Sequence, residues 1–178
     1  MTAAQRTGLD LTTDPSVVEA ARGGDRRAFA ALFAQYAPMV HGILLSRVRR
    51  EQADDLMQDV FVAAMERLSG LRDPAAFGGW LATIARNRAV DYFRTRRKTT
   101  ELPDDLAMPA RESSEAEQVL EVIRTLPEAY RETLVLRLVE GMSGPEISAR
   151  VGITAESVRV NLHRGMKLLK EKLGASEP

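Results

Sequence analysis

The chain contains no cysteine and only two histidines, and these shortages exclude several classes of protein. Without thiols there is no disulfide scaffold, thiolate metal site or cysteine nucleophile. His41 and His163 are too few to build a histidine metal centre. We therefore expect no metal ion and no other cofactor.

Long apolar runs are also missing. No stretch of about 18 residues is continuously apolar, so we expect no membrane insertion. The N-terminal sequence MTAAQRTGLDLTTDPS has no apolar segment of the kind found in secretory signals. These absences predict a cytoplasmic protein.

The formal net charge is zero, but the charges are unevenly distributed along the chain. Residues 77–98 carry six basic side chains and one acidic side chain, Asp91, whereas residues 99–121 carry seven acidic side chains and one basic. A basic segment of this kind is typical of nucleic-acid binding. The overall neutrality therefore does not argue against a nucleic-acid partner.

Apolar residues recur almost everywhere with helical spacing, and strand patterns are scarce, which predicts an all-α protein. Helix caps and apolar periodicity predict helices over 15–22, from Asp25 toward Arg49, over 52–68, over 77–97, and in a further helical block over 116–173.

Two small helical domains are expected, at 14–98 and 116–174, after a flexible tail over 1–13. The segment 99–115, TTELPDDLAMPARESSE, holds two prolines and many acidic residues without a helical period. Such a composition predicts a flexible acidic linker.

A helix-turn-helix is predicted at about 143–169. Ser143 and Glu146 have the spacing of a capping box, and Gly152 suits the end of the helix that they begin. Thr154 then caps a second helix after a short turn, which is helix-turn-helix spacing.

The second helix of this motif has two faces. Gly165 lies on the apolar face, where its lack of a side chain suggests close helix contact. The opposite face suits the major groove, since arginine can bond guanine and valine can touch a thymine methyl group. Its residues are Glu156, Arg159, Val160, His163, Arg164 and Lys167, of which Lys167 is expected at phosphate. The alternative is a solvated charged face, and His163 is equally explained as a surface histidine.

Two stretches of the first domain also suggest binding. The helix over 52–68 has an acidic face with an exposed valine, which is either solvated or a partner surface. Its residues are Asp54, Asp55, Gln58, Asp59, Val62 and Glu66. The stretch FGGWLATIARNRAVDYFRTRRK combines aromatic and basic side chains, which suits melted DNA. The alternatives here are a core role for Trp80 and a solvated basic helix end.

The chain resembles bacterial RNA polymerase sigma factors of the extracytoplasmic-function (ECF) group. The resemblance rests on DDLMQDVFVAAMERL, FGGWLATIARNRAVDYFR and LPEAYRETLVLRLVEGMSGPEISARVGITAESVRVNLHRGMKLL, in that order. It implies that the acidic helix binds the β′ coiled coil of core RNA polymerase and that the helix-turn-helix binds the −35 element. It also implies that segment 69–97 recognises and melts the −10 element, with loop 72–79 holding an extruded base. The −10 residues implied are Asn87, Arg88, Asp91, Arg94, Arg96 and Arg97.

The resemblance further implies an anti-sigma partner and no enzymatic activity. The sequence departs from the usual pattern at Ala155-Glu156, Val160-Asn161 and Gly165, so the family's promoter preference is not transferred. From the residues alone, a stand-alone helix-turn-helix regulator and an adaptor protein remain alternatives. An enzyme is disfavoured because the adjacent carboxylates Asp54-Asp55 and Asp104-Asp105 have no evident catalytic companion.

Overall fold

The computed structural model describes residues 13–99 and 114–174, and these ranges contain helices and turns but no strand. The expected all-α fold is confirmed. The expected N-terminal tail and most of the expected linker lie outside the described residues.

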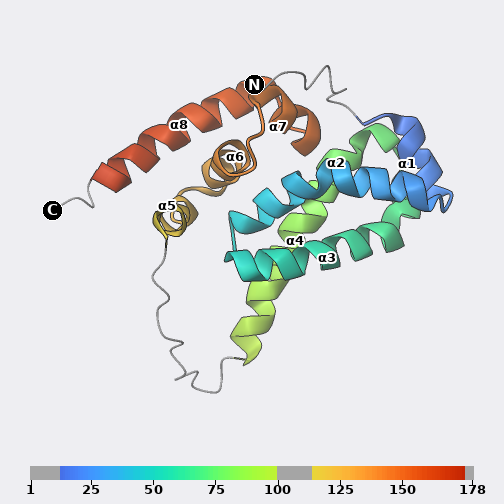
Figure 1. Cartoon of the computed structure of the whole chain (residues 1–178), viewed down its shortest axis with the longest axis horizontal. Coiled ribbons are helices and arrows are strands. Elements are labelled where there is room, and N and C mark those ends of the chain that lie inside the picture. The colour runs from blue at the N-terminus through green and yellow to red at the C-terminus, as the bar shows by residue number, and fades with distance from the viewer. Residues whose placement is uncertain (1–12, 100–113, 175–178) are drawn as a thin grey trace, which may run out of the picture.

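Eight α-helices and two short 3₁₀ turns make up the described residues (Figure 1). The first group is α1 (Pro15–Arg22), α2 (Arg26–Leu45), α3 (Arg50–Arg67), the turns η1 (Leu68–Gly70) and η2 (Pro74–Ala76), and α4 (Phe77–Thr99). The second group is α5 (Glu115–Arg124), α6 (Glu128–Leu138), α7 (Gly144–Val151) and α8 (Ala155–Gly174).

The first two helices begin at the predicted caps. The Asp14 carboxylate accepts a hydrogen bond from the backbone N–H of Ser16 at 2.9 Å, and Asp25 accepts one from Arg27 at 2.8 Å. The second helix ends at Leu45, short of the expected Arg49. Ser46 is the residue that follows its last turn; the Ser46 hydroxyl donates to the carbonyl of Ile43 at 2.7 Å, and the chain then turns toward α3.

Helix α2 forms the centre of the first group. Among the described helices it is long and apolar enough to cross a membrane, judged by length and composition only. Eight of its residues are buried, and it packs against α1, α3 and α4. This central position accounts for its apolar composition.

In the second group, α6 packs against α8, and α5 and α7 contact both. The expected helical block is interrupted at Thr125, where α5 ends, and Pro127 precedes α6. Gly165 is buried, and a Cβ there would lie 3.1 Å from Leu134 Cδ1 and 3.2 Å from Tyr130 Cβ. The close helix contact expected at Gly165 is confirmed.

The two groups of helices pack directly against each other, which the sequence did not predict. Helix α2 contacts α6 and α7, and α4 contacts α7. In Figure 1 the second group of helices lies beside α2 and α4 of the first group. The contact is close at Gly78, where an added Cβ would lie 2.2 Å from the backbone oxygen of Arg150.

Candidate functional site

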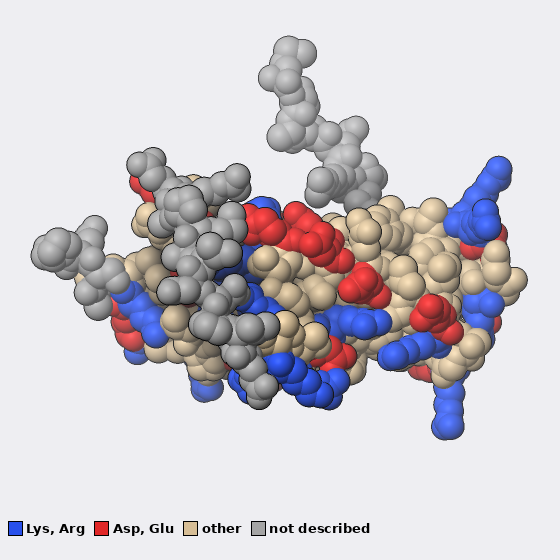
Figure 2. Space-filling view, turned by 90° about the horizontal axis from the view of Figure 1, so that it is seen from below, with Lys and Arg blue, Asp and Glu red and all other residues tan. Residues whose placement is uncertain are grey.

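The acidic face of α3 is open to solvent. All six residues singled out from the sequence are exposed, namely Asp54, Asp55, Gln58, Asp59, Val62 and Glu66. Val62 is 50% exposed although it lies between acidic neighbours. From the direction of Figure 2, acidic side chains form a broken band across the molecule with basic side chains beside it.

Apolar side chains that the sequence reasoning missed accompany this face. Met65 is 58% exposed, and Phe33 of α2 is partly exposed against Phe61, with the two ring centres 4.5 Å apart. Met65 follows Phe61 by one helical turn. The surface of α2 and α3 thus combines carboxylates with an apolar strip, which is typical of a protein-binding surface.

The second half of α4 presents the basic and aromatic residues. Asn87, Arg94, Arg96 and Arg97 are exposed, and Arg88 and Asp91 are half-buried. The Arg94 guanidinium donates to Asp91 Oδ1 at 2.8 Å, so these two groups are partners in the free protein.

Aromatic residues along α4 divide into two kinds. Trp80 is only partly buried, packing against buried Phe77 with ring centres 5.8 Å apart, so it belongs to the edge of the core. Phe93 is 43% exposed. Arg96 lies over the Tyr92 ring and donates to its hydroxyl at 3.1 Å. An exposed ring with nearby guanidinium groups can stack on bases and neutralise phosphates.

The turn between α7 and α8 has the predicted caps. Glu146 accepts from the backbone N–H of Ser143 at 2.7 Å, and Ser143 accepts from the backbone N–H of Glu146 at 3.3 Å, which completes a capping box. Gly152 adopts the left-handed conformation at φ 78°. Thr154 Oγ1 accepts from Ser157 N at 3.1 Å and caps α8.

Helix α8 keeps its apolar stripe inside and its polar residues outside. Glu156, Arg159, His163, Arg164 and Lys167 are exposed, whereas Val160 is partly buried. Glu156 and Arg159 form an exposed ion pair at 3.7 Å. Val160, Arg159, His163 and Arg164 line one shallow hollow.

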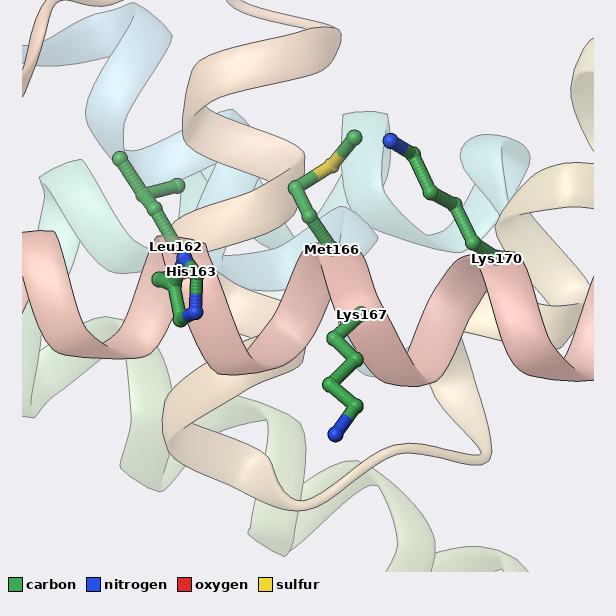
Figure 3. Close-up of a pocket in the computed structure, with 5 residues that line it drawn as sticks. All are labelled: Leu162, His163, Met166, Lys167 and Lys170. Carbon is green, nitrogen blue, oxygen red and sulfur yellow. The ribbon is translucent and has the colours of Figure 1, made fainter.

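A second hollow continues along α8 (Figure 3). Leu162, Met166 and Lys170 point to one side of the helix, and His163 and Lys167 point to the other. The outward surface of α8 is therefore basic with small apolar contributions.

A charged cluster, defined as Arg47, Arg86, Glu128 and Glu132, joins the two groups of helices. Glu132 of α6 accepts from Arg47 at 2.9 Å and from Arg86 of α4 at 2.7 Å, and Arg47 also pairs with Glu128. The side chains of Glu132 and Arg47 are only 8% and 5% exposed. Hydrogen bonding to Glu132 raises the pKa of Arg86, and hydrogen bonding to Arg47 lowers the pKa of Glu128.

His41 adds a second polar contact between the groups. Its Nδ1 lies 2.5 Å from Glu140 Oε1, and its Nε2 lies 3.3 Å from Asp54 Oδ1. The hydrogen bond to Glu140 raises the pKa of His41, although partial burial opposes the shift. Sequence reasoning missed the pairing of Arg47, Glu132 and His41, and it grouped Arg86 with the basic stretch. One sequence signal could have found this cluster. Glu132 occupies a position of its helix where the spacing of the apolar residues predicts a buried side chain.

The models of two known protein families match the chain, one in each group of helices. Sigma-70 region 2 matches residues 32–99, and the sigma-70 region 4 model matches residues 116–169. The region 2 match covers the candidate residues of α3 and α4, and the region 4 match covers those of α8.

Characterised relatives match over most of their length. RNA polymerase sigma factor CarQ of Myxococcus xanthus is 35% identical over 90% of this chain and 97% of its own. The ECF RNA polymerase sigma factor SigD of Mycobacterium tuberculosis is 32% identical over 90% of this chain and 84% of its own.

A solved structure has a similar arrangement. CnrH in complex with the cytosolic domain of CnrY matches with a TM-score of 0.63 and 28% identity, over 92% of this chain and 99% of that one. Similarity to sigma factors therefore extends through both groups of helices, which a stand-alone helix-turn-helix regulator would not require.

Proposed function

The chain belongs to the RNA polymerase sigma factors of the ECF group, and from that premise we propose how its surfaces direct promoter-specific transcription initiation. The unit over 14–98 binds core RNA polymerase and recognises and melts the −10 element. The unit over 116–174 binds the −35 element as duplex. The observation that carries this proposal is that α3, α4 and α8 each present most of their candidate residues to solvent, within the matched regions.

The polymerase surface is the acidic face of α3. Its carboxylates, led by Asp55 and Asp59, are exposed beside the apolar strip of Phe33 and Met65. The β′ coiled coil is the proposed occupant. Apolar contact at the centre supplies binding free energy, while the surrounding charges set orientation and association rate.

The −10 surface is the second half of α4. Asn87 and Arg88, together with the paired Asp91 and Arg94, face the non-template strand. Arg96 and Arg97 at the helix end neutralise phosphates. Phe93 is exposed beside them and is available for stacking.

The −35 surface is the outward face of α8. Arg164 and Arg159 contact base edges, and Glu156 accepts from cytosine. Val160 is less accessible than the polar residues, so its contact with a thymine methyl group depends on the depth at which α8 enters the groove. His163 and Lys167 lie farther along the helix and contact the backbone.

Three further features complete the proposal. The solved relative CnrH is held by the cytosolic domain of CnrY, which supports an anti-sigma partner for this chain. A sigma factor acts where polymerase and chromosome are, so the chain is cytoplasmic. It is not an enzyme, since polymerase performs the chemistry.

Run-off transcription with purified core polymerase tests the function. We expect promoter-dependent transcripts from a cognate template with the chain and none without it. Replacing Asp55 and Asp59 by arginine should abolish polymerase binding in a pull-down, whereas Glu171→Arg, an exposed acid on α8, should leave it intact. No transcript on any cognate template would overturn the proposal.

A further inference from the structure

Arginine side chains gather where α1, the start of α2 and the end of α3 meet. We call this surface the arginine end and define it as Arg26, Arg27, Arg67 and Arg72, all of which are exposed. From the direction of Figure 2, basic side chains project from the end of the molecule that α1 forms in Figure 1, with acidic side chains between them. The three surfaces of the proposed function include none of these four residues.

Three hydrogen bonds bring the four arginines to one place. The Arg22 guanidinium, at the end of α1, donates to the backbone oxygen of Leu71 at 2.7 Å. The backbone N–H of Leu71 donates to the oxygen of Leu68 at 3.1 Å, so the turn after α3 folds against α1. The backbone N–H of Asp25 donates to the oxygen of Ala20 at 3.0 Å and brings the start of α2 to the same place. Each of the four arginines lies within two positions of Asp25, Leu68 or Leu71 in the sequence.

The acidic side chains nearby do not pair with these arginines. Asp25 and Asp73 accept hydrogen bonds from backbone N–H groups at the starts of α2 and η2, and Glu19 pairs with Arg22. Glu66 is exposed and belongs to the polymerase surface. Within the part of the chain that the structure describes, none of the four arginine side chains forms an ion pair or a hydrogen bond. Their charges are therefore available to an anionic partner.

Two glycines leave open space between the arginines. Gly24 lies in the turn before Arg26, and Gly70 lies between Arg67 and Arg72. Apart from the neighbouring chain, a Cβ added at either glycine would have nothing within 4 Å. An extended partner can therefore approach the backbone without meeting a side chain. Guanidinium groups bind phosphate through paired N–H donors, so a nucleic-acid strand fits this surface.

The arginine end is placed to meet the strand that α4 holds. The −10 surface covers the second half of α4, and loop 72–79, which is expected to hold an extruded base, comes just before that half. Along the helix, Phe77 and Asn87 are about 15 Å apart at ~1.5 Å per residue. A strand that runs from the −10 surface to this loop leaves α4 beside Arg72, and its next phosphates reach the arginine end.

We propose that the arginine end binds phosphates of the melted non-template strand where that strand continues past loop 72–79. The proposal rests on the proposed function, because α4 must first hold the strand. An acidic protein segment would use the same charges, so the experiments are chosen to separate a protein partner from DNA.

Salt dependence tests the phosphate contacts. The unmodified chain and a variant with all four arginines replaced by glutamine are each assembled with core polymerase and bound to promoter DNA whose −10 region is opened by mismatches. Each arginine that contacts a single-strand phosphate contributes about 0.7 to the slope of log affinity against log salt. The slope should therefore decrease by about 2.8, and the variant's affinity deficit should shrink about 50-fold between roughly 50 and 200 mM salt. Arg50→Gln, exposed at the other end of α3, should leave the slope unchanged.

A carboxylate placed between the arginines tests the charge without removing any of them. Gly70→Glu should weaken binding to the opened promoter several-fold at low salt, because it repels phosphate and pairs with the neighbouring guanidinium groups. Gly70→Gln is the matched control of the same size and should bind like the unmodified chain. Equal binding by the two variants would overturn the proposal.

Neutral methylphosphonate groups locate the contact on the DNA. Each replaces one phosphate of the non-template strand. The positions that weaken binding by the unmodified chain, but not by the four-glutamine variant, should form one block at an edge of the −10 element. Absence of such a block would overturn the proposal.

A pull-down with core polymerase separates the remaining outcomes. The four-glutamine variant should capture as much polymerase as the unmodified chain. Reduced capture with an unchanged salt slope would make the arginine end a protein contact and overturn the proposal. If the unmodified chain gave no promoter-dependent transcript, the proposed function itself would fail.

Discussion

Arg164 is an exposed cation on α8, and its substitution can distinguish a base contact from a phosphate contact. It lies between Val160 and Lys167 on the outward face and lines a hollow with His163. Arg164→Ala should weaken −35 binding by about 1–3 kcal/mol and relax specificity at one base pair. Lys167→Ala should weaken binding to all sequences equally. Competition binding across single-base variants measures both, and a uniform loss for Arg164→Ala would make it a phosphate contact.

The contact between His41 and Glu140, which joins the two groups of helices, depends on pH. Its pKa is raised chiefly by the hydrogen bond to Glu140, with Asp54 adding attraction and Arg50 opposing it. A raised pKa means that the charged form of His41 stabilises the contact between the two groups of helices. This stabilisation is complete below the ordinary histidine pKa of about 6.5 and is lost as pH rises through the raised value.

The pH dependence can be measured by urea unfolding at a series of pH values. The free energy of unfolding should lose the contribution of this contact as pH rises above the ordinary histidine pKa of about 6.5. In His41→Gln this loss should be absent. Identical pH profiles in the two proteins would show that His41 does not stabilise the interface.

The first helix of the helix-turn-helix depends on its cap. Ser143 and Glu146 each satisfy a backbone N–H that would otherwise lack a partner at the start of α7. Ser143→Ala should lower the free energy of unfolding by about 1 kcal/mol. Urea unfolding measures this change, and Ser69→Ala, at an exposed turn, is the control. Equal stability of the two variants would contradict the role of the cap.

The contact between α6 and α8 depends on Gly165. A larger side chain would meet Leu134 and Tyr130 at 3.1–3.2 Å from its first carbon. Leucine is a good helix former, so Gly165→Leu isolates the packing effect and should destabilise the fold by about 1–3 kcal/mol. Glu171→Leu, exposed on the same helix, should change stability far less. Thermal unfolding of both variants tests the comparison.

Local signals explain why these elements were predictable from sequence. Asp14, Asp25, Ser143 and Thr154 each act within three residues of their own position, so spacing along the chain contains the necessary information. The end of α2 was predicted less well, because no glycine or proline lies between Leu45 and Arg49 to mark it in the sequence.

In the molecule as a whole, spacing along the sequence does not predict the contacts between the two groups of helices. Arg47 and Glu132 meet across 85 positions, and Gly78 meets Arg150 across the linker. The exposed faces of α3, α4 and α8 were predictable from helical periodicity. The positions of these three faces relative to one another were not predictable, because they depend on contacts between segments that are far apart in the sequence.

The interface between the two groups of helices should also couple their unfolding. Because Leu136 and Gly42 pack across the interface, separating the groups removes contacts from both. Calorimetry of the unmodified chain should show one cooperative transition, and Gly42→Leu should split it into two. Two transitions of unchanged temperature in both proteins would contradict the coupling.

The close approach at Gly42 has a consequence for genetics. Substitutions there that introduce a larger side chain should loosen the packing of α2 against α6, so loss-of-function alleles should map to this interface as well as to DNA-facing residues. Because the obstructing atoms belong mainly to the Leu136 side chain, Leu136→Ala should act as a second-site suppressor of Gly42→Ala. Allele-specific suppression of this kind would identify the two helices as packing partners without any structural measurement.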